Sequence, residues 1–195
     1  MKKVLFFAMT ALMCMSCAAK KPVAQQPARS ANPFGDTFEA PCTVYDTPEH
    51  FAATGIFRGS SHQLGEVQKG ALLNAQELVR LKMKHAYKGM VSEYSSNIGN
   101  NSGNDIERKM TSAGDRMIDA IINETSQSCT KYGQEEEDGH ITCYTAIEIS
   151  KAETAKKVAA AVQDLLSEDE KMRINFNEEQ YRQQMEKRFE EFKDK

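Results

Sequence analysis

The cysteines are the residues of this chain with the clearest chemistry. Cys129 and Cys143 flank a predicted β-hairpin centred near Glu136, so we expect them opposite one another on the same face of a sheet. Opposed cross-strand residues have Cβ atoms ~4.5–5.5 Å apart, which a disulfide can close in a pair that is not hydrogen-bonded. Three interpretations stay open: a disulfide, two buried reduced thiols, or a redox-active pair. The third lacks the Cys-x-x-Cys at a helix start that lowers a thiol pKa, and Cys42 is left over.

Other groupings of reactive residues are weaker. A zinc site would combine Cys129, His140 and Cys143, but His140 and Cys143 are an odd number of residues apart and face opposite sides of a regular strand. Ser60 and His62 lie close in sequence, but without a Gly-x-Ser-x-Gly turn or an orienting carboxylate, and a helix cap explains them better. The sequence therefore predicts no metal, no cofactor and no catalytic residue.

The first residues are typical of an export signal. Lys2 and Lys3 precede the apolar run VLFFAMTALM, which is too short to span a bilayer. The run leads to Ser16 and Cys17, and a small residue before a cysteine resembles the lipobox of bacterial lipoproteins. That resemblance implies cleavage before Cys17, whose thiol and new amino group then carry acyl chains that anchor the protein. Cys14 is the weaker candidate, because a bulky methionine precedes it.

Two features of the mature chain bear on its location and partners. Lipoproteins kept at the inner membrane carry an aspartate at the position of Ala18. Its absence here favours the outer membrane, with the periplasmic face as the expected side. Loss of Lys2 and Lys3 from 25 basic residues leaves 23 against 28 acidic ones, a formal charge of −5. A chain this acidic lacks the basic footprint of a nucleic-acid binder.

The pattern of apolar residues predicts an α+β fold. A long amphipathic helix crosses from a first strand to a hairpin, which gives a small antiparallel sheet packed by helices. Along the last strand, alternate residues from Ile141 to Ile149 form the buried face. The expected helices cover 64–94, 105–125, 151–166 and a stretch from 177 onward, and the expected strands cover 51–59, 126–133 and 140–150. Ser150-x-x-Glu153 and Asn177-x-x-Gln180 have the spacing of side-chain caps at the start of the last two helices.

Composition divides the chain into four parts. All five prolines lie between residues 18 and 48, a composition typical of a tether. The predicted parts are a signal peptide at 1–16, the lipidated cysteine and Pro-rich tether at 17–48, an α+β domain at 49–166 and a C-terminal helical extension at 167–195.

The C-terminal helix carries an apolar stripe with two interpretations. Its members are Tyr181, Met185, Phe189 and Phe192, at helical spacing. Aromatic area of this size is rarely left in water, so either the helix folds back onto its own domain or it is the partner-binding element. Apolar residues that lead into it, such as Ile174 and Phe176, favour folding back.

Two short motifs suggest a family. The helix motif Ala71-x-x-Asn74-Ala75-Gln76 and the hairpin motif Asp138-Gly139-x-x-x-x-Tyr144 resemble the LPP-twenty lipoprotein family. The same module is similar to the N-terminal domain of the flagellar assembly protein T. The resemblance implies a small α+β domain on the cell envelope and brings no catalytic residues with it.

These observations favour one function and leave an alternative. The first is a non-catalytic lipoprotein of the outer membrane that binds or scaffolds a protein or other envelope partner. It would contact the membrane through its lipid anchor and would bind no nucleic acid. The alternative is a periplasmic enzyme or thiol-redox factor that uses Cys129 and Cys143.

Overall fold

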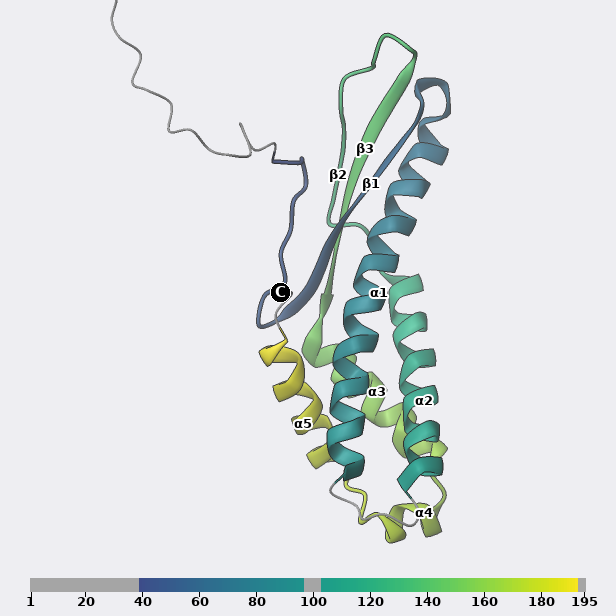
Figure 1. Ribbon diagram of the computed structural model, residues 1–195, viewed down its shortest axis with the longest axis vertical. Coiled ribbons are helices and arrows are strands. Elements are labelled where there is room, and N and C mark those ends of the chain that lie inside the picture. Colours follow the sequence, from purple (N-terminus) through teal and green to yellow (C-terminus); the bar gives the residue numbers. More distant parts are fainter. Residues whose placement is uncertain (1–38, 97–102, 193–195) are drawn as a thin grey trace, which may run out of the picture. The chain divides into compact units, whose positions relative to one another are not determined.

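The computed structural model describes residues 39–96 and 103–192, shown in colour in Figure 1. The signal peptide, Cys17 and the first part of the predicted tether lie outside the described residues, as does the end of the tail. The fold class is confirmed: helices pack against a three-stranded antiparallel sheet, with a C-terminal helix. The elements in chain order are β1 (His50–Ser60), the short 3₁₀ turn η1 (Ser61–Gln63), α1 (Leu64–Ser96), α2 (Gly103–Glu124), β2 (Cys129–Tyr132), β3 (His140–Ser150), α3 (Lys151–Leu165), α4 (Glu168–Arg173) and α5 (Glu178–Glu191).

Side-chain caps set where several helices begin. Ser150 Oγ accepts a hydrogen bond from the Glu153 N–H at the start of α3, at 3.3 Å. Asn177 Oδ1 does the same for the Gln180 N–H at the start of α5, at 2.9 Å. Each cap satisfies a backbone donor that has no partner inside the helix. The caps predicted from sequence at these positions are therefore confirmed.

The sheet has the order β1-β3-β2, with β3 in the middle. β1 and β3 pair along their whole length, from His50 opposite Ser150 to Ser60 opposite His140. β2 is shorter and pairs only with part of β3. On the inner face, which packs against α1, the predicted alternation of buried residues is confirmed at Cys143, Thr145, Ile147 and Ile149.

α1 lies against the inner face at very short range. A Cβ atom added to Gly55 would lie 2.1 Å from the Ala71 carbonyl oxygen and 2.3 Å from the Ala75 backbone nitrogen. Ala71 and Ala75 are fully buried, so small residues on both elements allow the backbones to approach. This contact places the first half of α1 directly over the centre of β1.

Beyond the sheet, α1 continues into a cluster of helices (Figure 1). α1, α2, α3 and α5 each contact two of the others, which closes a ring around one core. At its centre the Tyr87 hydroxyl donates to the Met110 carbonyl oxygen at 2.7 Å and lies 3.0 Å from the Tyr181 hydroxyl. The Tyr87 ring fills the space left by Gly114, where a Cβ atom would lie 2.1 Å from it. Helices from both ends of the chain thus share one core.

The close approach at Gly55 predicts the effect of one methyl group. Gly55→Ala should lower the free energy of unfolding by about 2 kcal/mol or more, because overpacking against backbone atoms forces the helix away from the sheet. Gly65→Ala is the matched control, since no atom lies within 4 Å of its added Cβ and alanine favours the helix. Urea unfolding of both variants measures the difference. Equal stability of the two would contradict this packing.

Candidate functional site

The cysteine pairing predicted from sequence is wrong. Cys42 is bonded to Cys129, with their Cα atoms 5.7 Å apart, and Cys143 is a buried free thiol. In the hairpin, Cys129 lies opposite Ala146. Because Cys143 is three residues from Ala146 along β3, its side chain lies on the opposite face of the sheet from Cys129. A thiol-redox site made of Cys129 and Cys143 is therefore excluded.

The geometry of the turn explains this error. We expected a symmetrical hairpin centred at Glu136, but the chain reverses around Asp138 and Gly139. The Gly139 N–H donates to the Glu136 carbonyl oxygen at 2.9 Å, and Gly139 has a φ of 74°, a conformation that favours glycine. The resulting register is shifted by three residues from the expected one. An odd shift exchanges the two faces of a strand.

Residues 39–48, here called the strap, belong to the folded domain and not to a free tether. The compact unit begins at Glu39, ahead of the boundary at residue 49 expected from sequence. The strap contacts the outer face of the sheet, the face opposite α1, where Thr54, Ala146 and Cys129 form one row. Thr54 Oγ1 donates to the Cys42 carbonyl oxygen at 2.7 Å and accepts from the Val44 N–H at 3.1 Å. Together with the disulfide, these contacts attach one end of the strap.

The other end of the strap is attached through Asp46. Its carboxylate accepts a hydrogen bond from the Ala52 N–H at 2.8 Å and pairs with the Lys82 ammonium at 3.1 Å. Lys82 also donates to the Ala52 carbonyl oxygen at 2.9 Å, and Asn74 donates to that of Ile56 at 2.8 Å. These groups occupy the edge of β1 that faces away from β3. An edge satisfied in this way is a poor template for an added strand.

A cleft of about 490 Å³ lies between the strap, β1, α1 and the end of α5. Half of its lining residues are apolar, and the charged ones are Lys82, Asp46 and Glu190. Ligand sites typically combine apolar walls with a small number of placed polar groups, in cavities of about 300–1,000 Å³. The apolar residues of the lining are Val44, Tyr45, Pro48, Ala53, Leu78 and Phe192.

A buried lysine connects the elements around this cleft. Lys151 is only 2% exposed, and its ammonium lies 4.8 Å from the centre of the Phe51 ring and donates to the Phe192 carbonyl oxygen at 3.4 Å. Burial lowers the pKa of Lys151, and the nearby Asp46 carboxylate opposes that shift. Lys151 thus ties the start of α3 to Phe192, directly after α5, beside the strap.

The C-terminal helix folds back onto its own domain. Tyr181, Met185 and Phe189 are fully buried, and the Phe189 ring lies 5.1 Å from that of Phe51. Burial raises the pKa of Tyr181 well above its ordinary value. Phe192 is partly buried against the same core and lines the cleft. The hypothesis that this stripe binds a partner is therefore wrong for the three fully buried side chains.

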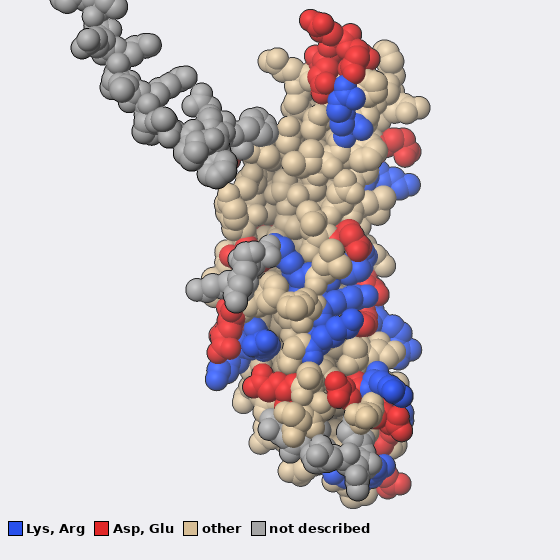
Figure 2. Space-filling model, viewed as in Figure 1, with Lys and Arg blue, Asp and Glu red and all other residues tan. Residues whose placement is uncertain are grey.

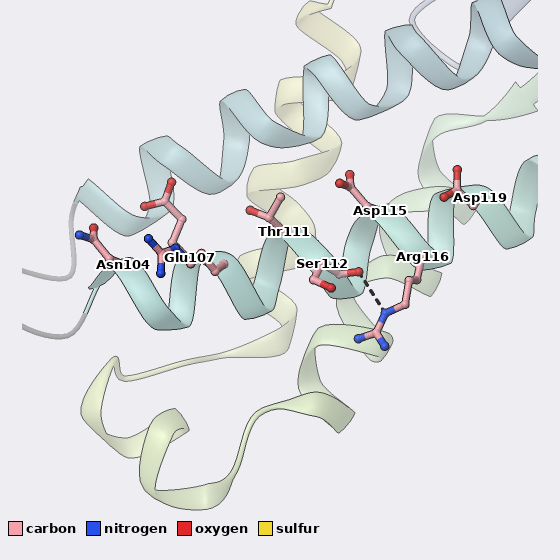
Figure 3. Close-up of a pocket in the computed structure, with 8 residues that line it drawn as sticks. Asn104, Glu107, Thr111, Ser112, Asp115, Arg116 and Asp119 are labelled. Carbon is pink, nitrogen blue, oxygen red and sulfur yellow. Dashed lines mark hydrogen bonds between the residues drawn. The ribbon is translucent and has the colours of Figure 1, made fainter.

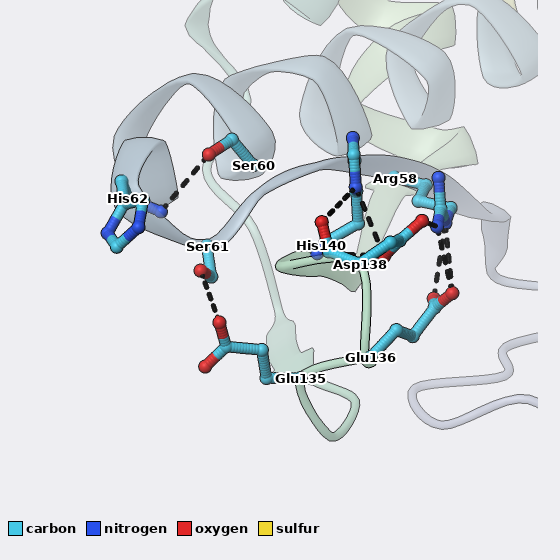
Figure 4. A network of polar contacts seen from close by, with 8 residues as sticks. All are labelled: Arg58, Ser60, Ser61, His62, Glu135, Glu136, Asp138 and His140. Atoms are coloured by element: carbon cyan, nitrogen blue, oxygen red, sulfur yellow. Dashed lines mark hydrogen bonds and ion pairs between the residues drawn. The ribbon is translucent and has the colours of Figure 1, made fainter.

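Polar groups gather at the tip of the hairpin (Figure 4). Arg58 pairs with Glu136 and Asp138, and its hydrogen bonds lower the pKa of both carboxyl groups. Figure 2 shows this charged tip at one end of the viewed face, next to a broad uncharged area, with most of the other charges of this face toward the opposite end. Because Arg58 engages two of the acidic groups, the tip is a structural ion cluster.

The serines beside Arg58 have structural roles. Ser60 Oγ accepts from the His62 N–H at 3.4 Å, and Ser61 Oγ donates to Glu135 at 2.7 Å. In Figure 4 the His62 imidazole points away from both hydroxyl groups. The structure therefore does not assemble a serine–histidine pair here, in agreement with the cap interpretation.

A second hollow of about 520 Å³ runs along α2 (Figure 3). All of its lining residues come from this one helix, so their polar groups do not converge on a point. Asp119 is already paired with Arg80 and Lys84, although one Asp115 carboxylate oxygen is buried without a hydrogen-bond partner. The cleft beside the strap, lined by four segments, is the better candidate site. Sequence reasoning missed it, because its walls meet only through tertiary contacts.

Comparison with protein-family models, characterised proteins and solved structures found no match to this chain. The resemblance to the LPP-twenty family therefore stays a prediction. Within 39–96 and 103–192, no group of three His, Cys, Asp or Glu side chains is placed to hold a metal ion. In the same residues, no helix combines the length and the apolar character needed to cross a bilayer.

Proposed function

We propose that this protein is an outer-membrane lipoprotein, acylated on Cys17, whose domain binds a protein or envelope partner on the periplasmic side without catalysing a reaction. The observation that carries this proposal is the disulfide between Cys42 and Cys129. Disulfides of this kind persist in oxidising compartments such as the periplasm and are rare in the cytosol. The export signal and the Met15-Ser16-Cys17 sequence supply the route and the anchor.

The cleft beside the strap supports a binding role. Two apolar side chains at the cleft keep much of their area in water, since Tyr45 is 73% exposed and Leu78 is 46% exposed. Exposed apolar groups around a hollow often mark a contact with another molecule. Two of the ionised groups nearby have structural partners: the Asp46 carboxylate already binds the Ala52 N–H and Lys82. Binding by the apolar walls is the activity that this arrangement favours.

Metabolic labelling with palmitate tests the anchor. In a bacterium that processes lipoproteins, Cys17→Ala should abolish label incorporation and release the protein from the membrane fraction, because the cysteine that carries the acyl chains is removed. Cys14→Ala is the matched control and should keep the label. Label that depends on Cys14 and survives Cys17→Ala would contradict the assignment.

Photo-crosslinking in intact envelopes tests the binding surface. A photoreactive amino acid at position 45, on the cleft, should give a discrete product larger than the protein alone. The control is the same group in place of Met172 in α4, which is 71% exposed but does not line the cleft, and should give none. Equal yields from both positions, or no product from position 45, would contradict binding at the cleft.

A further inference from the structure

The strap is held almost entirely by side chains. A backbone-to-backbone hydrogen bond joins the strap to the strand that follows, from the Thr47 N–H to the His50 carbonyl oxygen at 3.0 Å. Its other attachments include the Cys42–Cys129 disulfide, the contacts of Thr54, those of Asp46, and the hydrogen bonds that Thr47 Oγ1 accepts from the Glu49 and His50 N–H groups. A segment with so few backbone hydrogen bonds can open without unfolding the sheet below it.

The backbone at Cys42 adopts a conformation that opening would relieve. Its φ is 58°, in the left-handed region that residues with a side chain rarely occupy. The disulfide on one side and the Thr54 hydroxyl on the other keep the residue in place. Such residues persist only when their surroundings constrain them.

The disulfide is open to attack from solution but not from within the domain. Cys42 and Cys129 are both partly exposed on the outer face. The remaining described thiol, Cys143, is fully buried on the inner face, in a cluster with Val67 and Ala71. Since the sheet separates Cys143 from the disulfide, an exchange reaction needs an external thiol.

Release of the strap would change both the shape and the charge of the cleft. Val44, Tyr45 and Pro48 form one of its walls, and this wall would leave with the strap. Asp46 would leave too, and with it the carboxylate that pairs with Lys82 and favours the charged form of Lys151. The opened surface would therefore be less enclosed and more positive than the closed one.

We propose that the Cys42–Cys129 disulfide is a redox-sensitive latch, which a dithiol reductant opens to release the strap and dismantle the cleft. A thiolate of the reductant attacks one cysteine sulfur, the bond between Cys42 and Cys129 breaks, and the leaving sulfur takes up a proton. The second thiol of the reductant then displaces the other cysteine. The reductant leaves as a disulfide, having given up two electrons and two protons, and the protein gains two thiols. Opening of the strap also ends binding at the cleft, and this part of the proposal rests on the function proposed above.

Amide hydrogen exchange followed by NMR on the full mature chain tests the latch. The Val44 and Ala52 N–H groups are local reporters, because they donate to Thr54 Oγ1 and to Asp46. After reduction with dithiothreitol, both should exchange at least about tenfold faster, while the amide of Ile147, in the middle of β3, should be unchanged. Cys42→Ser with Cys129→Ser should give the fast rates without reductant. Cys143→Ala, which keeps the disulfide, should respond as the wild type does.

Two results would overturn the proposal. Unchanged exchange at Val44 and Ala52 after reduction would show that Thr54 and Asp46 hold the strap without the disulfide. Faster exchange at Ile147 as well would show that the disulfide stabilises the whole fold and not the strap alone. The crosslink from position 45 separates this proposal from the proposed function: if the strap opens on reduction but the crosslink persists, the latch is supported and binding at the cleft is not.

Discussion

The backbone contact between α1 and β1 is the constraint on which the rest of the structure depends. Gly55 has no Cβ atom, and Ala71 and Ala75 bring only methyl groups, so the helix lies directly on the strand. Burial of the apolar stripe of α1 against the sheet offsets the entropy cost of ordering so long a helix. With α1 placed in this way, its far half projects beyond the sheet and offers Tyr87 and its neighbours to the other helices.

Polar and covalent contacts then place the two ends of the described chain on this framework. Asp46 ties the strap to both β1 and α1, and the disulfide ties it to β2. Lys151 and the aromatic ring of Phe51 bring the last turn of α5 to the same region. The cleft exists because these separate attachments meet at one place.

The sequence was informative where a structure depends on local periodicity. The stripe of α1, the caps at Ser150 and Asn177 and the alternation along β3 predicted the elements and the fold class correctly. The cysteine pairing depended instead on the position of the hairpin turn. The expected centre of the hairpin was one and a half residues too early, and this error placed Cys143 on the same face of the sheet as Cys129 instead of the opposite one.

The strap was missed for a related reason. Its prolines are typical of a tether, but its order comes from Thr54 in the next strand and from Lys82 and Cys129, which lie far from it in sequence. The stripe of α5 allowed both interpretations, and the apolar residues before the helix favoured folding back, which the packing of Tyr181 and Phe189 bears out. Tertiary contacts of this kind leave no periodic pattern in a sequence.

The central claim is that the segment before β1 is bonded into the domain through Cys42. Mass spectrometry of an unreduced proteolytic digest of the exported protein tests it most directly. We expect one cross-linked pair of peptides, containing Cys42 and Cys129, and a Cys143 peptide that is alkylated only after the protein is unfolded. A cross-linked pair that joins Cys129 to Cys143, or three free thiols at these positions, would contradict the account.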